Sequence, residues 1–516
     1  MTEVSQEIDF EEIASGVPGR LHAVIDRYVV ETPDHLALIE DSGAWSYREL
    51  DKHTRDIASC LASLGVRGGD RIMIVSENCI ALAALLLAAS RLDAWAIVAN
   101  PRLSAREIDQ IQNHSGARRM FFTVATSKEA ASHAERVGAE IREIGPLREI
   151  GVSGLNSATS AEPVEEDPAR QIAVLIYTSG TTGVPKGIML SHENLLINAA
   201  TVARVRRFEA RDKVYVVLPI SHIVGISLLT MTLMVGGTVR LVSKYDPTAV
   251  VKAIAEEGVT VLNGVPATYQ RLLEYKALSG VIKRDRGSLR RISVAGAPLD
   301  LALKSRVEAE FGLPLCNEYG TTECSPGISC VRFDSPRPDD TVGALIPGVE
   351  ARIRTVDGAP TANGQVGELH VRGRNVMRGY YRAPDLTAKV IDSEGWFNTG
   401  DLARFEGDCL YIVGRTKEMI IRSGFNVYPA EIEAVLNSHE DVVQSAVVGR
   451  PVEGNEEVVA FVQLIRGSKI GVDDLLDLLR DQLAAYKRPS EIILLDKMPA
   501  TSTGKILKNE LAQSLR

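Results

Sequence analysis

The sequence contains few cysteines, and none of them stands in a metal-binding or disulfide-scaffold pattern. Structural zinc sites use closely spaced Cys and His ligands, and disulfide frameworks are typical of small secreted chains. No C-x-x-C pair occurs in the 516 residues. The six cysteines are Cys60, Cys79, Cys316, Cys324, Cys330 and Cys409. We therefore predict a reduced, cytoplasmic protein without structural zinc.

An excess of positive charge is also missing. The formal net charge is −9 at pH 7, which argues against nucleic acid or an anionic membrane as the main partner. The most apolar stretch, residues 80–99, is interrupted by Arg91 and Asp93. A buried helix followed by a strand fits this stretch better than a membrane span. Residues 1–12 are acidic and lack a signal-peptide pattern, so no stable membrane insertion is expected.

The order of predicted elements indicates an α/β protein with two domains. From about residue 45 to 294, short β-branched runs alternate with helical patterns, which predicts parallel sheets with crossover helices. The polar, acidic residues 153–170 predict a surface linker. After Thr341, short strands with Gly-rich turns predict a small β-barrel-like or antiparallel subdomain. A separate α+β pattern begins at about Glu418, so we predict domains at residues 1–416 and 417–516.

The strongest local signal is the segment YTSGTTGVPKG at residues 177–187, which follows an apolar strand pattern. Small residues let a backbone curl so that its N–H groups converge on anionic oxygens. Hydroxyl groups and a lysine add donors and positive charge for a triphosphate. The spacing is not that of a Walker A loop, and a plain flexible loop is the alternative. The predicted phosphate-binding residues are Thr178, Ser179, Gly180, Thr181, Thr182, Gly183 and Lys186.

This segment resembles the signature of the adenylate-forming superfamily, which contains acyl- and aryl-CoA synthetases, adenylation domains of nonribosomal peptide synthetases and beetle luciferases. The resemblance covers about residues 21–508, because further motifs follow in the family's order. It implies a large N-terminal domain that holds ATP and the acid, and a small mobile C-terminal domain. It also implies ATP, Mg²⁺ and coenzyme A as cofactors.

Two motifs resemble the part of the family's site that holds adenosine. In the segment NEYGTTE at residues 317–323, Tyr319 would stack on adenine. In GWFNTGD at residues 395–401, Asp401 would accept hydrogen bonds from both ribose hydroxyls, and Arg415 would also contact the ribose. The turn and loop residues implied to line the nucleotide are Gly296, Ala297, Pro298, Gly320 and Thr321.

The resemblance places catalytic residues on both domains. Thr322 would bind the α-phosphate, and Glu323 would help to hold Mg²⁺, which takes oxygen ligands beside phosphates. Lys417 would be the hinge, and Gly424 would leave a passage for the pantetheine arm of CoA. Lys505, in PATSTGK at residues 499–505, would bridge the acyl carboxylate and the α-phosphate. Without the resemblance, both lysines would be ordinary solvated charges.

The acid-binding pocket has the weakest sequence pattern of these sites. By resemblance it is placed at His222, Ile223, Val224 and Gly225. An isolated histidine is usually a satisfied core residue, but its motif favours the pocket. The apolar lining suits an apolar tail, so we predict a medium- or long-chain fatty acid. An aromatic acid of benzoate or cinnamate type is the alternative, because residues 100–103 and 222–225 also resemble benzoate-type CoA ligases.

The resemblance implies an AMP-forming acyl-CoA synthetase. The acid would attack the α-phosphorus of MgATP, and CoA would then displace AMP from the acyl-adenylate. A stand-alone adenylation enzyme for a carrier protein is an alternative. A noncatalytic homologue would be expected to lack Lys505, Glu323 or Gly424. Residues 499–505 also match a pattern that lysine acetyltransferases read in bacterial acyl-CoA synthetases, which predicts acetylation of Lys505; a loop that no transferase meets is the alternative.

Overall fold

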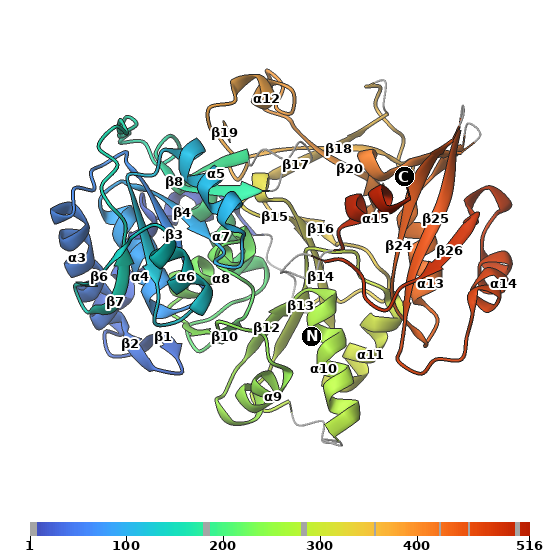
Figure 1. The fold of residues 1–516 in the computed structure, drawn as a ribbon, viewed down its shortest axis with the longest axis horizontal. Helices are drawn as coiled ribbons and strands as arrows, with labels where there is room; N and C mark the ends of the chain where they lie inside the picture. The colour runs from blue at the N-terminus through green and yellow to red at the C-terminus, as the bar shows by residue number, and fades with distance from the viewer. Residues whose placement is uncertain are drawn as a thin grey trace.

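A computed structural model describes residues 8–178, 186–279, 286–355, 358–422, 425–452, 455–500 and 506–515. Two large sheets, parallel in their centres and antiparallel at their edges, occupy the N-terminal part (Figure 1). The eight-stranded sheet has the order β6 (Glu140–Ile144), β7 (Leu147–Val152), β5 (Arg119–Thr123), β3 (Arg71–Val75), β4 (Trp95–Ala99), β8 (Ile172–Thr178), β9 (Lys186–Ser191) and β19 (Gly379–Tyr380). The nine-stranded sheet has the order β2 (Gly43–Ser46), β1 (Leu36–Glu40), β11 (Thr238–Leu241), β10 (Lys213–Val216), β12 (Val261–Gly264), β13 (Arg291–Val294), β14 (Leu315–Gly320), β15 (Gly327–Cys330) and β16 (Ala344–Leu345). The predicted α/β class is confirmed.

Three buried helices join these sheets into one core. Most residues of α4 (Ile80–Arg91), α7 (His192–Val205) and α8 (Ile223–Met234) are buried, and they share a hydrophobic cluster with residues of both sheets. Helices that are apolar on all sides are expected in such a position. The apolar stretch at residues 80–99 is therefore α4 followed by β4, as predicted. Among the described residues, no helix combines the length and the apolar character that a membrane span requires.

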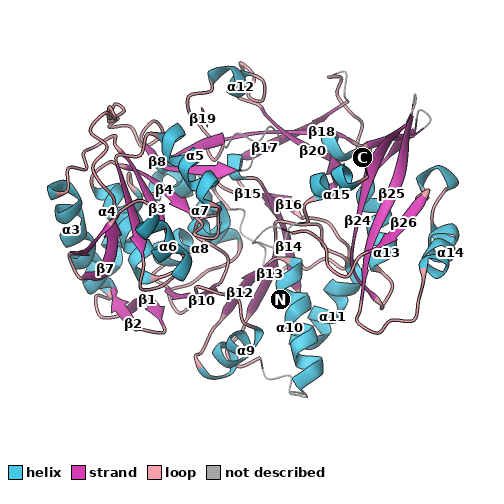
Figure 2. Ribbon diagram, in the orientation of Figure 1, coloured by secondary structure: helices cyan, strands magenta, loops and turns pink. Residues whose placement is uncertain are grey.

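Further helices either precede the first strand, as α1, η1 and α2 do, or lie between strands along the chain (Figure 2). They are α1 (Phe10–Gly16), η1 (Leu21–Ile25), α2 (Asp26–Glu31), α3 (Tyr47–Ser63), α5 (Ala105–Ser115), α6 (Lys128–Arg136), α9 (Pro247–Glu256), α10 (Pro266–Ser279) and α11 (Leu301–Phe311). Capping boxes begin α3 at Ser46 and α5 at Ser104. Each satisfies backbone N–H groups that a helix start leaves without partners.

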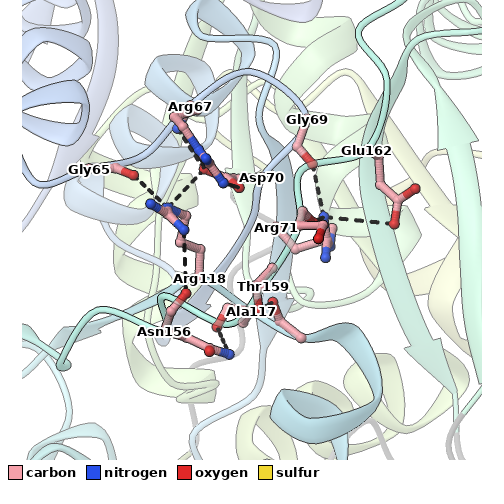
Figure 3. A network of polar contacts seen from close by, with 12 residues as sticks. Gly65, Arg67, Gly69, Asp70, Arg71, Ala117, Arg118, Asn156, Thr159 and Glu162 are labelled. Carbon is pink, nitrogen blue, oxygen red and sulfur yellow. Dashed lines mark hydrogen bonds and ion pairs between the residues drawn. The ribbon is translucent and has the colours of Figure 1, made fainter.

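The polar segment at residues 153–170 is fixed to the eight-stranded sheet. Figure 3 shows Arg71, the first residue of β3, and Arg118, which directly precedes β5, as centres of polar contacts. Both arginines are buried. The backbone N–H of Asn156 donates to the carbonyl of Arg118 at 2.9 Å, and Arg71 donates to the carbonyl of Ser160 at 2.8 Å. The predicted linker thus lies on the surface but follows a fixed path towards β8.

The C-terminal third contains a small antiparallel sheet followed by a compact α+β unit (Figure 1). The antiparallel sheet has the order β17 (Val349–Arg354), β18 (Gly367–Gly373), β20 (Phe397–Glu406) and β21 (Cys409–Arg415), with α12 (Pro384–Ala388) before β20. The last unit contains η3 (Thr416–Glu418), β22 (Ile420–Arg422), β23 (Phe425–Val427), α13 (Pro429–Asn437), β24 (Val442–Val452), β25 (Asn455–Leu464), α14 (Val472–Gln482), η4 (Ala485–Lys487), β26 (Glu491–Leu494) and α15 (Lys508–Ser514). The last unit has hydrophobic clusters of its own, and Gln270 on α10 donates to the carbonyl of Val443 at 2.9 Å.

Candidate functional site

Residues from three distant motifs meet where β14 ends beside the small antiparallel sheet. The hydroxyl of Tyr319 donates to Oδ2 of Asp401 at 2.5 Å. Nε of Arg415 donates to Oδ1 of the same carboxylate at 2.6 Å. Burial and the nearby Asp401 charge hold the pKa of Tyr319 well above its usual value, so its proton stays in this hydrogen bond. A carboxylate has about four lone-pair sites, so Asp401 can still accept from a sugar diol.

The turn before Asp401 explains why the NTGD residues occur together. The side chain of Asn398 accepts from the N–H of Gly400, whose φ of +71° favours glycine. Oγ1 of Thr399 accepts from the N–H of Asp401 at 3.1 Å and donates to the carbonyl of Leu369 at 2.9 Å. The buried carboxylate is therefore held by its own turn and by the neighbouring strand β18.

A second group of residues lies on the predicted phosphate side. Thr322 and Glu323 form η2 (Thr322–Cys324), directly after β14. Oε1 of Glu323 accepts from the hydroxyl of Tyr380 at 3.1 Å, and Nζ of Lys186 lies 5.3 Å from the centre of the Tyr380 ring. Burial, followed by the Glu323 charge, raises the pKa of Tyr380. This tyrosine therefore lies between the lysine of the glycine-rich loop and the predicted metal carboxylate.

Sequence reasoning missed Tyr380. Its only local signal is the short run GYY at residues 379–381, which has no nucleotide-binding pattern. The tyrosine reaches Glu323 because β19 pairs with β9, and the carbonyl of Glu323 accepts from the N–H of Met377 at 2.7 Å. Such a contact between residues 57 positions apart can be found only from the fold.

Both ends of the glycine-rich loop are anchored. At its start, the hydroxyl of Tyr177 is hydrogen-bonded to Nδ1 of His114 at 2.9 Å. At its end, the carbonyl of Gly187 accepts from the N–H of Tyr381 at 2.7 Å. A Cβ atom on Gly187 would lie 3.1 Å from the Tyr177 ring, so the two ends pack closely. Thr178 and Lys186 pair across β8 and β9; the predicted Ser179, Gly180, Thr181, Thr182 and Gly183 lie outside the described residues.

The remaining residues predicted to line the nucleotide lie at or just after the ends of β13 and β14, two neighbouring strands of the nine-stranded sheet. Gly296, Ala297 and Pro298 form the turn after β13, the parallel neighbour of β14. Gly320 cannot carry a side chain, because a Cβ atom there would lie 2.0 Å from the carbonyl oxygen of Pro326. The N–H of Thr321 donates to the same carbonyl at 3.0 Å. The tight turn brings Thr322 and Glu323 back towards the sheet.

The predicted acid-binding residues occupy the start of α8. His222 is exposed and Val224 is half-buried, whereas Ile223 belongs to the main hydrophobic cluster. Gly225 is buried, and a Cβ atom there would lie 2.3 Å from the carbonyl oxygen of Pro219. Close packing against the preceding turn therefore accounts for this glycine. Lys417 lies in η3, between β21 and β22; Gly424 and Lys505 lie outside the described residues.

Comparison with known proteins identifies the family. Residues 25–381 match the AMP-binding enzyme family, and residues 431–505 match the AMP-binding enzyme C-terminal domain. The chain belongs to the AMP-binding enzymes. Feruloyl-CoA synthase from Amycolatopsis is 35% identical over 486 residues, covering 93% of this chain and 96% of the relative. 4-Coumarate–CoA ligase 5 from rice, Oryza sativa, is 32% identical over 516 residues (96% and 94%). This chain is therefore an acyl- or aryl-CoA ligase, and it uses ATP and CoA.

Solved structures of one relative also align with nearly the whole of this ligase. ATP-bound MatB from Rhodopseudomonas palustris aligns with a TM-score of 0.85 at 32% identity, covering 96% of this chain and 98% of MatB. Apo MatB from the same organism aligns with a TM-score of 0.76 at 31% identity and the same coverage. By this measure, the structure of this ligase is more similar to ATP-bound MatB than to apo MatB.

The residues present are compatible with Mg²⁺. This ion keeps several waters and is usually held by one or two carboxylates together with substrate phosphates. Glu323 provides one carboxylate beside the glycine-rich loop, and the Tyr380 hydroxyl orients it. Within the described ranges, no group of three or more His, Cys, Asp or Glu side chains forms a metal site. A site completed by ATP phosphates needs no such cluster.

Proposed function

We propose that this ligase converts an aromatic carboxylic acid into its CoA thioester in two steps through an acyl-adenylate. The observation that supports the nucleotide step is the contact of Tyr319 and Arg415 with the two oxygens of Asp401. The acid class is supported by the relatives named for ferulate and 4-coumarate, and by an indoleacetate–CoA ligase from Aromatoleum aromaticum that is 32% identical.

In the first step, a carboxylate oxygen attacks the α-phosphorus of ATP, and the bond to the bridging oxygen of pyrophosphate breaks. Asp401 and Arg415 would fix the ribose, while Thr322 would donate to the α-phosphate. Lys505 would neutralise the charge that gathers between the acid and this phosphate, and a positive charge held ready at such a point accounts for much of the rate enhancement of many enzymes. Mg²⁺, when bound beside Glu323, would supply charge neutralisation for the phosphates.

In the second step, the CoA sulfur attacks the carbonyl carbon of the adenylate, the bond to the AMP oxygen breaks, and the thiol proton passes to solvent. We propose that the C-terminal unit turns about Lys417 between the steps. Lys505 would then leave the site, and the loop at Gly424 would admit the pantetheine arm. A small domain would thereby serve both half-reactions.

A medium- or long-chain fatty acid is the second candidate substrate. The apolar start of α8 and a long-chain-fatty-acid–CoA ligase from Escherichia coli, 29% identical, support it. The full chain should be incubated with ATP, Mg²⁺, CoA and a panel of aryl and alkyl acids, with AMP and thioesters measured by mass spectrometry. Aryl thioesters should dominate. Alkyl thioesters alone would favour the fatty acid, and pyrophosphate without any thioester would favour a carrier-protein adenylation enzyme.

A further inference from the structure

Two buried asparagines hold the turn that follows the proposed metal carboxylate. Asn198 lies on α7 and Asn375 lies between β18 and β19, and they are 0% and 2% exposed. Nδ2 of Asn375 donates to the carbonyl oxygens of Cys324 and Gly327 at 3.0 and 2.9 Å. Nδ2 of Asn198 donates to the same two oxygens at 3.4 and 3.0 Å, and its Oδ1 accepts from the N–H of Gly327 at 3.3 Å. Both ends of this turn are therefore held by the two amides.

The donors and acceptors at this turn match in number. Each amide NH₂ group has two N–H donors, and each carbonyl oxygen has two lone pairs. Gly327 permits the approach of Asn198, because a Cβ atom on this glycine would lie 3.1 Å from Nδ2. Oδ1 of Asn375 has no partner among the described residues, and a buried oxygen without a partner is destabilising. An apolar residue would avoid that cost, so the contacts of Nδ2 account for an asparagine at this position.

The turn carries Glu323, which directly precedes Cys324 at the end of η2. The carbonyl of Glu323 accepts from the N–H of Met377 at 2.7 Å, and its carboxylate accepts from the hydroxyl of Tyr380 at 3.1 Å. Asn375, Met377 and Tyr380 belong to one short stretch of chain. This stretch therefore fixes the proposed metal ligand through the turn, through its backbone and through its carboxylate.

The same contacts connect the turn to the strand that follows the glycine-rich loop. β9 begins at Lys186 and leads directly into α7, and β19 pairs with β9. Asn194 lies one helical turn before Asn198, on the same face of α7. Its Nδ2 donates to the carbonyl of Arg374 at 2.7 Å. α7 and residues 374–380 therefore join the lysine side of the proposed phosphate site to its carboxylate side.

MgATP must contact both sides of this site at once, and a small misplacement of groups around a reacting centre lowers the rate strongly. We infer that Asn198 and Asn375 are positioning residues for adenylation. They act through the backbone of the turn and set the place of Thr322 and Glu323 relative to Lys186. This inference rests on the proposed adenylation step.

The test removes the amide donors and keeps a side chain of similar size. In Asn375→Leu and in Asn198→Leu, kcat for pyrophosphate release should fall by about 10-fold, and the Mg²⁺ concentration required for half-maximal rate should rise. Thiolysis of supplied acyl-adenylate should be retained, because this step does not use the metal or Glu323. A loss of folded protein would instead lower both half-reactions together.

Asn78→Leu is the matched control. The buried amide of Asn78 donates to the carbonyls of Val216 and Leu218 at 3.2 and 3.0 Å, and its Oδ1 accepts from the N–H of Ile220 at 2.8 Å. The control variant therefore loses the same kind of contacts at a different turn. It should keep the Mg²⁺ dependence of the unaltered ligase, even with a lower melting temperature.

Three results would overturn the inference. They are an unchanged Mg²⁺ dependence in folded Asn198 and Asn375 variants, an equal rise in Asn78→Leu, and a parallel loss of both half-reactions, which would show a structural role only. If the leucine variants do not fold, Asn375→Ser and Asn198→Ser remove the same amides with smaller side chains and are judged by the same measurements. No pyrophosphate from the unaltered ligase with any acid would instead contradict the proposed function.

Discussion

At the scale of single residues, Tyr380 connects parts of the site that lie far apart in the sequence. Its hydroxyl donates to Glu323, and its ring lies against Lys186. The adjacent Tyr381 faces a different partner, since its hydroxyl donates to Glu162 at 2.5 Å. Of these two consecutive tyrosines, Tyr380 at the end of β19 contacts the proposed metal carboxylate, and Tyr381 in the following turn contacts the 153–170 segment.

Tyr380→Phe should slow adenylation by about 10-fold, because Glu323 loses the donor that orients it. The Mg²⁺ concentration required for half-maximal rate should rise. Pyrophosphate release should be measured over a Mg²⁺ titration. Tyr381→Phe is the matched control, and it should keep the Mg²⁺ dependence because its hydroxyl does not reach Glu323. Equal Mg²⁺ dependence in both variants would exclude a positioning role for Tyr380.

Lys505→Ala should reduce adenylation by about 10³-fold or more, because the transition state loses its positive charge. Thiolysis of supplied acyl-adenylate should be largely retained, since Lys505 is proposed to leave the site before that step. Acetylation of Lys505 should have the same effect by removing its charge. Separate assays of the half-reactions, with intact mass to follow acetylation, would check this. An equal loss in both half-reactions would contradict the assignment.

At the scale of elements, a neutral histidine fixes the N-terminal segment to α7. His192 begins the helix, is fully buried, and its Nδ1 accepts from the N–H of Leu21 at 3.0 Å. Burial, followed by the charge of Arg20, lowers the pKa of His192 from 6.5 to about 3. A protonated ring would lose the acceptor, so the contact between η1 and α7 depends on the neutral form.

Acidification should therefore destabilise the fold below pH 6.5. Between about pH 6.5 and pH 3, the unfolded chain binds a proton at residue 192 that the folded chain does not bind. The stabilising contribution is thus complete above pH 6.5 and decreases as the pH falls towards 3. The free energy of unfolding should be measured by denaturant titration at several pH values. His192→Asn should be less stable at pH 7.5 and lose less stability on acidification; an unchanged pH slope would contradict the argument.

At the scale of the whole molecule, the C-terminal unit lies against the N-terminal part, in a structure that is more similar to ATP-bound MatB than to apo MatB. Gln270 on α10 contacts the carbonyl of Val443 across this junction. Arg415 lies immediately before η3, where the proposed hinge Lys417 is located, and it pairs with Asp401 across β20 and β21. A rotation there would leave the adenosine contacts in place while the following elements move.

Gly424→Leu should block thioester formation and spare the first step, because a branched side chain would fill the proposed pantetheine passage. The acyl-adenylate should accumulate to about one equivalent in a single-turnover experiment, as measured by quenched mass spectrometry. Gly467→Leu is a control on the same unit, since a Cβ atom there meets nothing within 4 Å, although its φ is +88°. Normal thioester formation by Gly424→Leu would exclude the passage from this loop.

The sequence by itself determined the family, the α/β class and many elements. The ordered motifs from residue 177 to 505 identified the family, and the apolar pattern at residues 80–99 predicted the buried helix and strand that the structure contains as α4 and β4. These properties are local, because a strand or loop depends mainly on neighbouring residues. The tertiary structure alone brought Tyr380 to Glu323 and Arg206 to Glu318. It also buried Arg291 on β13, because burial and pairing depend on which strands become neighbours, which the sequence pattern does not specify.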